Sequence, residues 1–395
     1  MSKNPMQGKT VSIRRNVWAL GFVSLFNDIA SEMVYPIIPL FLTQTLGASA
    51  SIVGVIEGIA EATASVLKVF SGWFSDRFRR RKPLVTAGYT VSALSKFILS
   101  LSGMWWQVLF ARFVDRVGKG TRTSARDALI ADSTDEERRG AAFGLHRALD
   151  TTGAIIGPLL ALALLHFLHE KYATIFLIAV IPGLIGVALL IFLVREPARV
   201  TTTPPLSLKL SLRALSRPFR IFLLVNVLFA LGNSSDAFLI LRARSLGFDA
   251  VAIVLLYVAF NVSYALFAFP IGKLADRFGA RRVLILSFLF FALLYAGFGR
   301  ITEPFLLWIF FPLYGVYMAM SEGVTRAYIS QIVPAEIRAT AMGGFYTITG
   351  VTTFFSSFIA GLLWQYIGVS APFYFGATTA AIACGLFLRL RPGIS

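Results

Sequence analysis

Side chains suited to catalysis or metal binding are scarce in this chain of 395 residues. It has a single cysteine, Cys384, and three histidines, His146, His166 and His169. One thiol excludes an internal disulfide and a metal site built from several cysteines. The histidines do not form the His-Glu-x-x-His pattern of metalloproteases, and the Gly-x4-Gly-Lys-Ser/Thr loop of ATPases is absent. We therefore expect no enzyme activity, no resident metal and no cofactor.

Charge is also scarce, at 14% of residues, whereas 56% of residues are hydrophobic. A soluble domain does not have this composition, but a protein with many membrane spans does. The formal net charge of +17 suggests a nucleic-acid partner at first sight. However, the cations concentrate in short loops beside apolar segments, and no basic soluble domain is present to bind nucleic acid. The partner that the composition predicts is the lipid bilayer.

Long apolar segments recur along the chain, and each can cross a bilayer core of about 30 Å as a helix. The first segment is too long for a signal peptide and contains Asp28 and Glu32, so we interpret it as a retained span. The sequence predicts an all-α integral membrane protein with twelve transmembrane helices in two pseudo-symmetric six-helix bundles. The expected spans are 17–43, 51–74, 83–103, 105–130, 140–166, 172–194, 221–243, 250–275, 283–299, 304–331, 339–367 and 371–388.

A stretch rich in proline, threonine and cations interrupts the apolar pattern at 195–220. We interpret it as a linker with a short amphipathic surface helix, between bundles at 17–194 and 221–390. Residues 1–16 and 391–395 are expected to be terminal tails. Cations gather in the loops near 77–82, 138–139, 195–220 and 277–282, and are missing near 44–50, 104 and 366–370. The positive-inside rule therefore predicts cytoplasmic termini, in the plasma (inner) membrane.

The two halves are an internal repeat with an offset of two hundred residues. Chance supplies one or two matches at a fixed offset, but not a series without net gaps. The matched positions include Leu46 with Leu246, Gly47 with Gly247, Asp76 with Asp276, Arg77 with Arg277, Arg126 with Arg326, Glu136 with Glu336, and Gly144 with Gly344.

A glycine and an Asp-Arg pair stand between the second and third spans of each half. The stretches are GWFSDRFRRRKPL at 72–84 and GKLADRFGARRVL at 272–284. Both resemble the loop signature of the major facilitator superfamily. The resemblance implies a monomeric secondary transporter that works by alternating access. It also implies a cytoplasmic latch, in which the aspartates face helix N-termini of the other half and the arginines pair with glutamates in the matching loops. The latch residues are Gly72, Asp76, Arg77, Gly272, Asp276, Arg277, Glu136 and Glu336.

The fourth and fifth spans carry two further resemblances. Arg112 and Gly118 match the superfamily's Arg-x-x-Gln-Gly-x-Gly pattern, which is associated with proton coupling, although Asp115 and Arg116 replace Gln-Gly. In the fifth span, the spacing of glycines that ends in a Gly-Pro pair is similar to the superfamily's antiporter motif, without its closing Gly-Gly. This motif implies gating residues and favours export by antiport, whereas the simpler alternative is close helix packing. The residues are Gly144, Gly153, Gly157 and Pro158.

Charged residues at membrane depth are the candidate site, because each costs free energy unless it is paired or faces a watery cavity. Asp28, Glu32 and Asp150 are the candidates for carrying a proton. Arg112, Arg116 and Arg122 are candidates for binding an anionic substrate group. Further substrate contacts are predicted at Glu57, Glu61, Asp236, Glu322 and Arg326. The alternative is that such charges pair and lock helices together, which we favour for Asp115, Lys119, Arg126 and Asp127. Tyrosines within spans that could line a cavity are Tyr35, Tyr257, Tyr264, Tyr314 and Tyr346.

The sequence leaves three functions open. The first is proton-coupled export of small amphipathic or charged organic compounds by antiport. The second is import of a charged or zwitterionic metabolite, or of a metal chelate, by proton symport, which the ionic spans favour. The third is a sensor or lipid-handling protein that uses the same fold without transport and needs no carboxylate that binds a proton.

Overall fold

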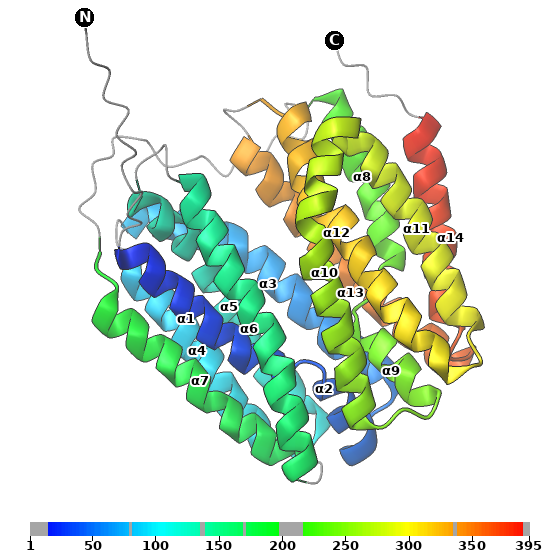
Figure 1. The fold of residues 1–395 in the computed structure, drawn as a ribbon, viewed down its shortest axis with the longest axis horizontal. Coiled ribbons are helices and arrows are strands. Elements are labelled where there is room, and N and C mark those ends of the chain that lie inside the picture. The colour runs from blue at the N-terminus through cyan, green and yellow to red at the C-terminus, as the bar shows by residue number, and fades with distance from the viewer. Residues whose placement is uncertain are drawn as a thin grey trace, which may run out of the picture.

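The computed structural model describes residues 15–78, 81–134, 139–168, 171–196, 216–334 and 338–389, and these residues form helices and no strand. The helices fall into two groups that follow each other in the chain (Figure 1). The first group consists of α1 (Arg15–Glu32), α2 (Ile38–Leu40), the π-helix η1 (Phe41–Thr45), α3 (Ala50–Phe78), α4 (Lys82–Ser100), α5 (Trp105–Asp132), α6 (Arg139–Phe167) and α7 (Tyr172–Leu193).

The second group repeats the first. It consists of α8 (Arg217–Gly232), α9 (Ala237–Ser245), α10 (Ala250–Phe278), α11 (Ala280–Arg300), the 3-10 helix η4 (Pro304–Leu306), α12 (Leu307–Ile332), α13 (Arg338–Tyr366) and α14 (Ala371–Arg389). Helices α3 and α10 begin and end two hundred residues apart, as the sequence repeat requires. Polar caps set two of the starts: the side chains of Ser216 and Asp249 accept backbone N–H bonds at the first turns of α8 and α10.

The first helix of each group is broken. Helix α1 ends before a turn at residues 33–37 that contains Pro36, and α8 ends before residues 233–236, with the sequence Asn-Ser-Ser-Asp. Pro36 has no backbone N–H to continue a helix, and the polar run offers side-chain partners to the backbone. If each broken helix counts as one span, the described residues supply six spans in each half. Non-helical backbone at membrane depth is tolerated where it is buried in protein or lines a cavity.

Nine of these spans, within the part of the chain that the structure describes, are long and apolar enough to cross a membrane by themselves. The other three spans are α1, α4 and α5. They belong to the first half, and each has charged residues within its length. The outer surface is apolar: Phe192 on α7, for example, is 81% exposed. Such exposure suits contact with lipid rather than water.

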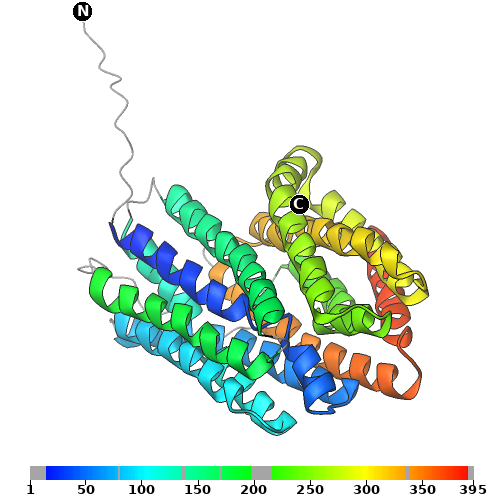
Figure 2. The same ribbon diagram turned by 60° about the horizontal axis from the view of Figure 1, so that its bottom comes forward.

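The two halves meet along α3 and α13, which lie side by side in both views (Figures 1 and 2). Glycines make this approach possible. A Cβ atom on Gly58 would come within 2.9 Å of the backbone oxygen of Phe354, and one on Gly361 within 2.7 Å of the Cα atom of Ser51. Small residues at such spacing allow helix backbones to approach closely in a membrane. The seam joins the N-terminal part of α3 to the C-terminal part of α13.

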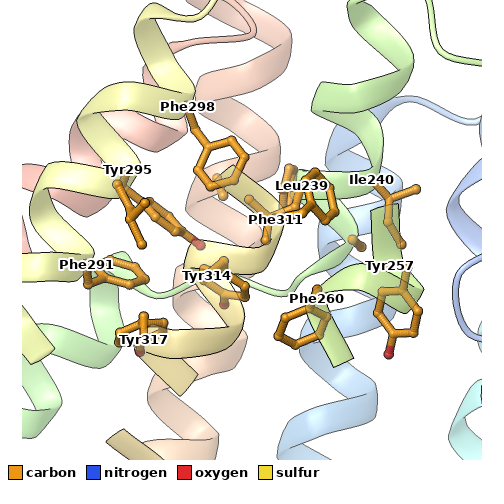
Figure 3. Close-up of a cluster of buried hydrophobic side chains, with 14 of the residues drawn as sticks. Leu239, Ile240, Tyr257, Phe260, Phe291, Tyr295, Phe298, Phe311, Tyr314 and Tyr317 are labelled. Atoms are coloured by element: carbon orange, nitrogen blue, oxygen red, sulfur yellow. The ribbon is translucent and has the colours of Figure 1, made fainter. Parts of the chain in front are cut away.

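The core of the second half is aromatic (Figure 3). The rings of Phe291 and Tyr295 lie 3.9 Å apart between centroids, and Tyr314 and Tyr317 lie 5.3 Å apart. These side chains come from α11 and α12, and Phe260 of α10 packs on Tyr314. Aromatic pairs in such offset and tilted arrangements stabilise packing beyond the area they bury. The cluster fixes the position of the tyrosine hydroxyls at its edge.

The expected roles of the two terminal tails and of the central linker remain predictions. The expected tails and most of the expected linker, residues 197–215, lie outside the described residues. Helix α8 begins at Arg217, within the segment expected to be the linker. The proposed domain boundaries are therefore not tested by the structure, although the helices begin and end close to the expected spans.

The seam between the halves gives a test of this arrangement. The Ser51 hydroxyl of α3 donates to the Gln365 side chain of α13 at 2.5 Å. In a Cys384→Ser background, we expect Ser51→Cys with Gln365→Cys to be joined by a short dimaleimide. With a protease site inserted at 197–215, the cross-linked halves should stay together on a denaturing gel after cleavage. Each single variant is the control. Two thiols that react with maleimide but do not join the halves would contradict the seam.

Candidate functional site

A cavity of about 440 Å³ lies between the halves and is lined by both helix breaks. In the first half its wall comes from α1, α3, α4 and α5, and in the second half from α10, α12 and α13. Most polar side chains on the first wall are charged, whereas the second wall combines carboxyl groups with neutral hydroxyls and amides. The volume is within the range of sites that hold small molecules.

The most buried ion pair beside the cavity joins Glu57 of α3 to Arg112 of α5. Glu57 is 1% exposed, and its carboxylate accepts bonds from Arg112 Nη2 at 2.7 and 2.8 Å and from Nε at 3.1 Å. The guanidinium also lies 5.6 Å from the ring centre of Tyr35. A charge-assisted pair with several bonds offsets much of the cost of burying both ions. In this structure the pair fastens α3 to α5.

Two more ion pairs join α5 to its neighbours, one to α3 and one to α4. Arg116 Nη2 of α5 lies 2.9 Å from Glu61 of α3. Lys96 of α4 lies 2.6 Å from Asp115 of α5, whose carboxylate also accepts the Ser92 hydroxyl at 2.5 Å. The pairing expected for Asp115 is therefore present, with Lys96 as its partner. Together the pairs tie α3 and α4 to α5, and both reach the cavity wall.

Arg122 and Lys119 of α5 also line the cavity, but without a carboxylate within ion-pair distance among the described residues. The Arg122 guanidinium lies 4.6 Å from the ring centre of Tyr89, and its buried Nη1 has no hydrogen-bond partner. For Lys119 the expected ion pair is not found among the described residues, although the next residue, Gly120, packs against Ala64 and Leu67 of α3. Arg126 does pair, with Asp127 at 2.9 Å.

The carboxyl groups chosen as proton carriers lie together on α1 and α6. The Asn27 side-chain amide donates to Asp28 at 3.2 Å. The Ser24 hydroxyl donates to Asp150 at 2.6 Å, and Arg147 lies 3.2 Å from the same carboxylate. Asp28 faces the cavity, and Glu32, one turn further, also lines it. The contact of Glu32 is neutral: it accepts the hydroxyl of Tyr257, from the second half, at 2.9 Å.

The glycines of the fifth span press α6 against this part of α1. A Cβ atom on Gly153 would come 3.1 Å from Cβ of Asp28, and one on Gly157 would come 2.9 Å from Cβ of Glu32. Both would also lie within 2.8 Å of α1 carbonyl oxygens, those of Leu25 and Ile29. Pro158 follows inside the helix. The residues predicted to gate movement therefore pack directly against the residues predicted to carry protons.

The second half contributes two carboxyl groups to the wall. Asp236, at the break before α9, accepts the Tyr314 hydroxyl at 2.7 Å. Glu322 of α12 accepts the Tyr264 hydroxyl at 2.5 Å and the Arg326 guanidinium at 2.8 Å. Arg147 reaches across from α6 to within 3.6 Å of Glu322. Arg326 itself is not part of the cavity lining: it lies one turn further along α12, and its side chain is half exposed.

The latch residues stay predictions. Gly72, Asp76 and Arg77 belong to the last turns of α3, where the backbone is described but the side chains are not, and Glu136 and Glu336 lie outside the described residues. Gly272 has open space beside its Cα atom. Asp276 and Arg277 are exposed at the end of α10.

Some cavity residues were not selected from the sequence. Lys119, Asn233, Ser234 and Ser235 line the wall. The signal for the last three was available: a run of four polar residues inside an apolar segment marks a helix break. By contrast, Tyr35, Tyr257 and Tyr314 line the cavity as expected for tyrosines within spans.

Removal of one member of the buried pair should be costly. Glu57→Gln leaves the Arg112 cation buried without its partner, which we expect to destabilise the protein by about 3–5 kcal/mol. The measurement is denaturant or thermal unfolding in detergent. Glu57→Gln combined with Arg112→Gln removes both charges and should recover most of the loss. A single variant within about 0.5 kcal/mol of the parent, the range of ordinary surface changes, would refute a structural role for the pair.

Side chains added to the packed face of α6 should displace α1. Gly157→Ala meets backbone atoms that cannot swing away, so we expect a loss of about 1–3 kcal/mol, as for overpacked cores. Gly144→Ala is the matched control, because its Cβ atom would meet nothing within 4 Å. Unfolding in detergent measures both. Equal stabilities of the two variants would mean that α6 and α1 are not in close contact.

Comparisons with known proteins agree with this architecture. The family model of the Major Facilitator Superfamily matches residues 20–241 and 222–394. The uncharacterized MFS-type transporter MJ1317 of Methanocaldococcus jannaschii is 35% identical over 394 residues, which cover 98% of this chain and 97% of the relative.

Solved transporters share the fold at low sequence identity. A structure of the nucleoside transporter NupG has a TM-score of 0.78 at 16% identity, covering 95% of this chain and 99% of that one. A POT family transporter in complex with a thioalcohol-conjugated peptide has a TM-score of 0.80 at 14% identity, covering 95% of each chain. The helices, the cavity between two repeated halves and the family match lead to one conclusion: this chain is a multi-pass membrane protein and secondary transporter that belongs to the Major Facilitator Superfamily.

Proposed function

We propose that this transporter exports a small charged organic compound in exchange for protons, and that Asp28, Asp150 and Glu32 carry the proton. The observation that carries the proposal is the position of these carboxyl groups. Asp28 and Glu32 line the cavity from α1, and Asp150 lies on α6, where the Ser24 hydroxyl of α1 donates to it at 2.6 Å. Among the described residues, neither Asp28 nor Glu32 has a cation within ion-pair distance. A carboxyl group that faces a cavity without a cation in contact is suited to binding and releasing a proton.

Exchange requires that proton and substrate compete. Glu32 and Asp236 face the cavity, and each accepts a hydrogen bond from a tyrosine rather than from a cation. A carboxyl group without a cation in contact can bind either a proton or a positively charged group of the substrate, but not both. This competition is the physical basis of antiport, and it agrees with the export that the glycine motif of α6 implies.

Arg147 offers a route from the proton site to movement of the halves. It lies 3.2 Å from Asp150 in its own half, and in the other half it lies 3.6 Å from Glu322 and donates to Tyr264 at 3.0 Å. We propose that a proton on Asp150 weakens its hold on Arg147, which then moves towards Glu322. The proton would thus change the contacts between the halves, as alternating access requires.

The remaining assignments complete the proposal. We place the chain in the inner membrane with both termini in the cytoplasm, on the loop charges. We propose a monomer of two bundles, 17–194 and 221–390, joined by the linker at 195–220. The loop residues Asp76, Arg77, Asp276 and Arg277 would hold the cytoplasmic side closed in the opposite state, with Glu136 and Glu336 as partners.

Uptake by proton symport is the second candidate, and one observation favours it. Arg122 and Asp28 line the same cavity, and neither Arg122 nor Lys119 has a carboxylate within ion-pair distance among the described residues. A substrate anion bound there would compete with Asp28 for these cations and so favour a proton on Asp28. Proton and anion would then bind together, as symport requires.

Proton flux in proteoliposomes tests the proposal. The purified protein is challenged with panels of cationic drugs and of anionic metabolites, and an internal pH dye reports movement of protons. We expect a substrate to evoke proton flux opposite to its own direction, and Asp28→Asn to lower that flux at least tenfold. Glu303→Gln, an exposed carboxylate outside the cavity, is the matched control.

The outcomes separate the candidates. Flux in the same direction as the substrate would replace antiport by symport. Substrate transport that is unchanged by Asp28→Asn and Glu32→Gln would remove these carboxyl groups from the mechanism. Absence of transport for every compound in both panels would favour a sensor or lipid-handling role.

A further inference from the structure

One face of α5 carries a row of cations that is only partly neutralised. The row follows the helical spacing of three or four residues, so its members share one side of the helix. The first two members in chain order, Arg112 and Arg116, pair with glutamates of α3, and the last member, Arg126, pairs with Asp127. Lys119 and Arg122, in the middle, have no such partner among the described residues. Both of these residues line the cavity, as do the paired Arg112 and Arg116.

Arg122 is the more deeply buried of the two cations. It is 5% exposed, and its Nη1 atom is fully buried without a hydrogen-bond partner. The guanidinium carbon lies 4.6 Å from the ring centre of Tyr89, and the residue lines the cavity. Guanidinium N–H groups form a planar fork that matches the oxygens of a carboxylate or a phosphate.

Lys119 lies three residues earlier, on the same side of α5. It is half-buried and lies between the cations Arg116 and Arg122, with Glu61 of α3 and Asp28 of α1 as nearby carboxylates that are not within ion-pair distance. Two like charges held together in a partly buried place are unfavourable unless an anion binds between them. An ammonium beside a guanidinium gives a point charge and a fork for the same oxyanion.

We infer that the substrate carries an oxyanion group, a phosphate or a carboxylate, which binds Arg122 and Lys119. This inference rests on the proposed function in taking the cavity to be the transport site, and it adds the chemical class of the substrate. An anion at this place favours a proton on Asp28, so exchange for protons also requires a positively charged group of the substrate that competes with the proton at Glu32 or Asp236. The carboxyl groups of Glu32 and Asp236 line the same cavity and would receive any positively charged group. The substrate is then an anionic or zwitterionic metabolite rather than a lipophilic cation.

Binding of simple anions in detergent tests the inference without transport. The probes are inorganic phosphate, succinate and acetate, with gluconate at equal ionic strength as the reference, and the readout is the thermal unfolding temperature. We expect phosphate or succinate at millimolar concentration to raise this temperature by several degrees in the parent protein. Arg122→Gln and Lys119→Gln should each abolish the rise, and Arg122→Lys should keep part of it. The matched control is Arg300→Gln, an exposed arginine outside the cavity.

The stability of Arg122→Gln without a ligand separates an anion site from a purely structural role. If Arg122 serves to bind an anion, the variant should unfold at the same or a higher temperature than the parent, because it removes a buried, repelled cation. If Arg122 only holds the structure together, the variant should unfold at a lower temperature. A lower temperature without ligand, or a rise with phosphate or succinate that survives in both Gln variants, would overturn the inference. So would the absence of any rise with all three anions. A rise with phosphate alone assigns a phosphorylated substrate, and one with succinate alone assigns a carboxylate.

The two proposals fail separately. Anion binding that is intact in Asp28→Asn, together with proton flux that this variant does not change, would overturn the proton site and leave the anion site. Proton flux that depends on Asp28, without any anion effect on unfolding, would overturn the anion site and leave the proton exchange.

Discussion

A row of five cations on one face of α5, three of them buried, is the constraint on which the first half depends. A charge removed from water must find a counter-charge: glutamates of α3 pair with Arg112 and Arg116, and Asp115 of α5 pairs with Lys96 of α4. These pairs fix the rotation and height of α3, α4 and α5 more strictly than apolar contacts do, because displacement of any helix would leave an ion unpaired. The cavity lies beside these pairs and is also lined by Lys119 and Arg122.

The second half repeats the helices but not the chemistry. Apart from the Glu322–Arg326 pair of α12, α10, α11 and α12 share stacked and tilted rings around Phe291, Tyr295 and Tyr314 (Figure 3). Its tyrosine hydroxyls meet carboxyl groups from both halves, at Glu32 and at Asp236. Aromatic packing needs no counter-charge. The first half therefore packs around ion pairs, whereas the second half packs around rings whose hydroxyls donate to carboxyl groups.

The sequence predicted the spans and the repeat well, because a membrane helix must be long and apolar and its loops must carry the cations. It also placed Asp28, Glu32, Asp236 and Glu322 at the depth of the cavity. It did not separate Arg112, which is paired, from Arg122, which is not. That difference depends on which neighbouring helix each turn of α5 faces, and a single helix pattern does not contain it. The breaks at 33–37 and 233–236 were visible as Pro36 and a polar run, but an average over about twenty residues conceals so short an interruption.

The glycine seam between α3 and α13 has a consequence for the entropy of the contact between the halves. Gly54, Gly58 and Gly361 have no side chain to immobilise when the halves meet, and the serines beside them have little rotamer freedom to lose. Forming the seam therefore costs little side-chain entropy. An interface of long side chains would have to order them each time it formed. The small residues keep the entropic part of the cost of this contact low, whichever side of the molecule is open.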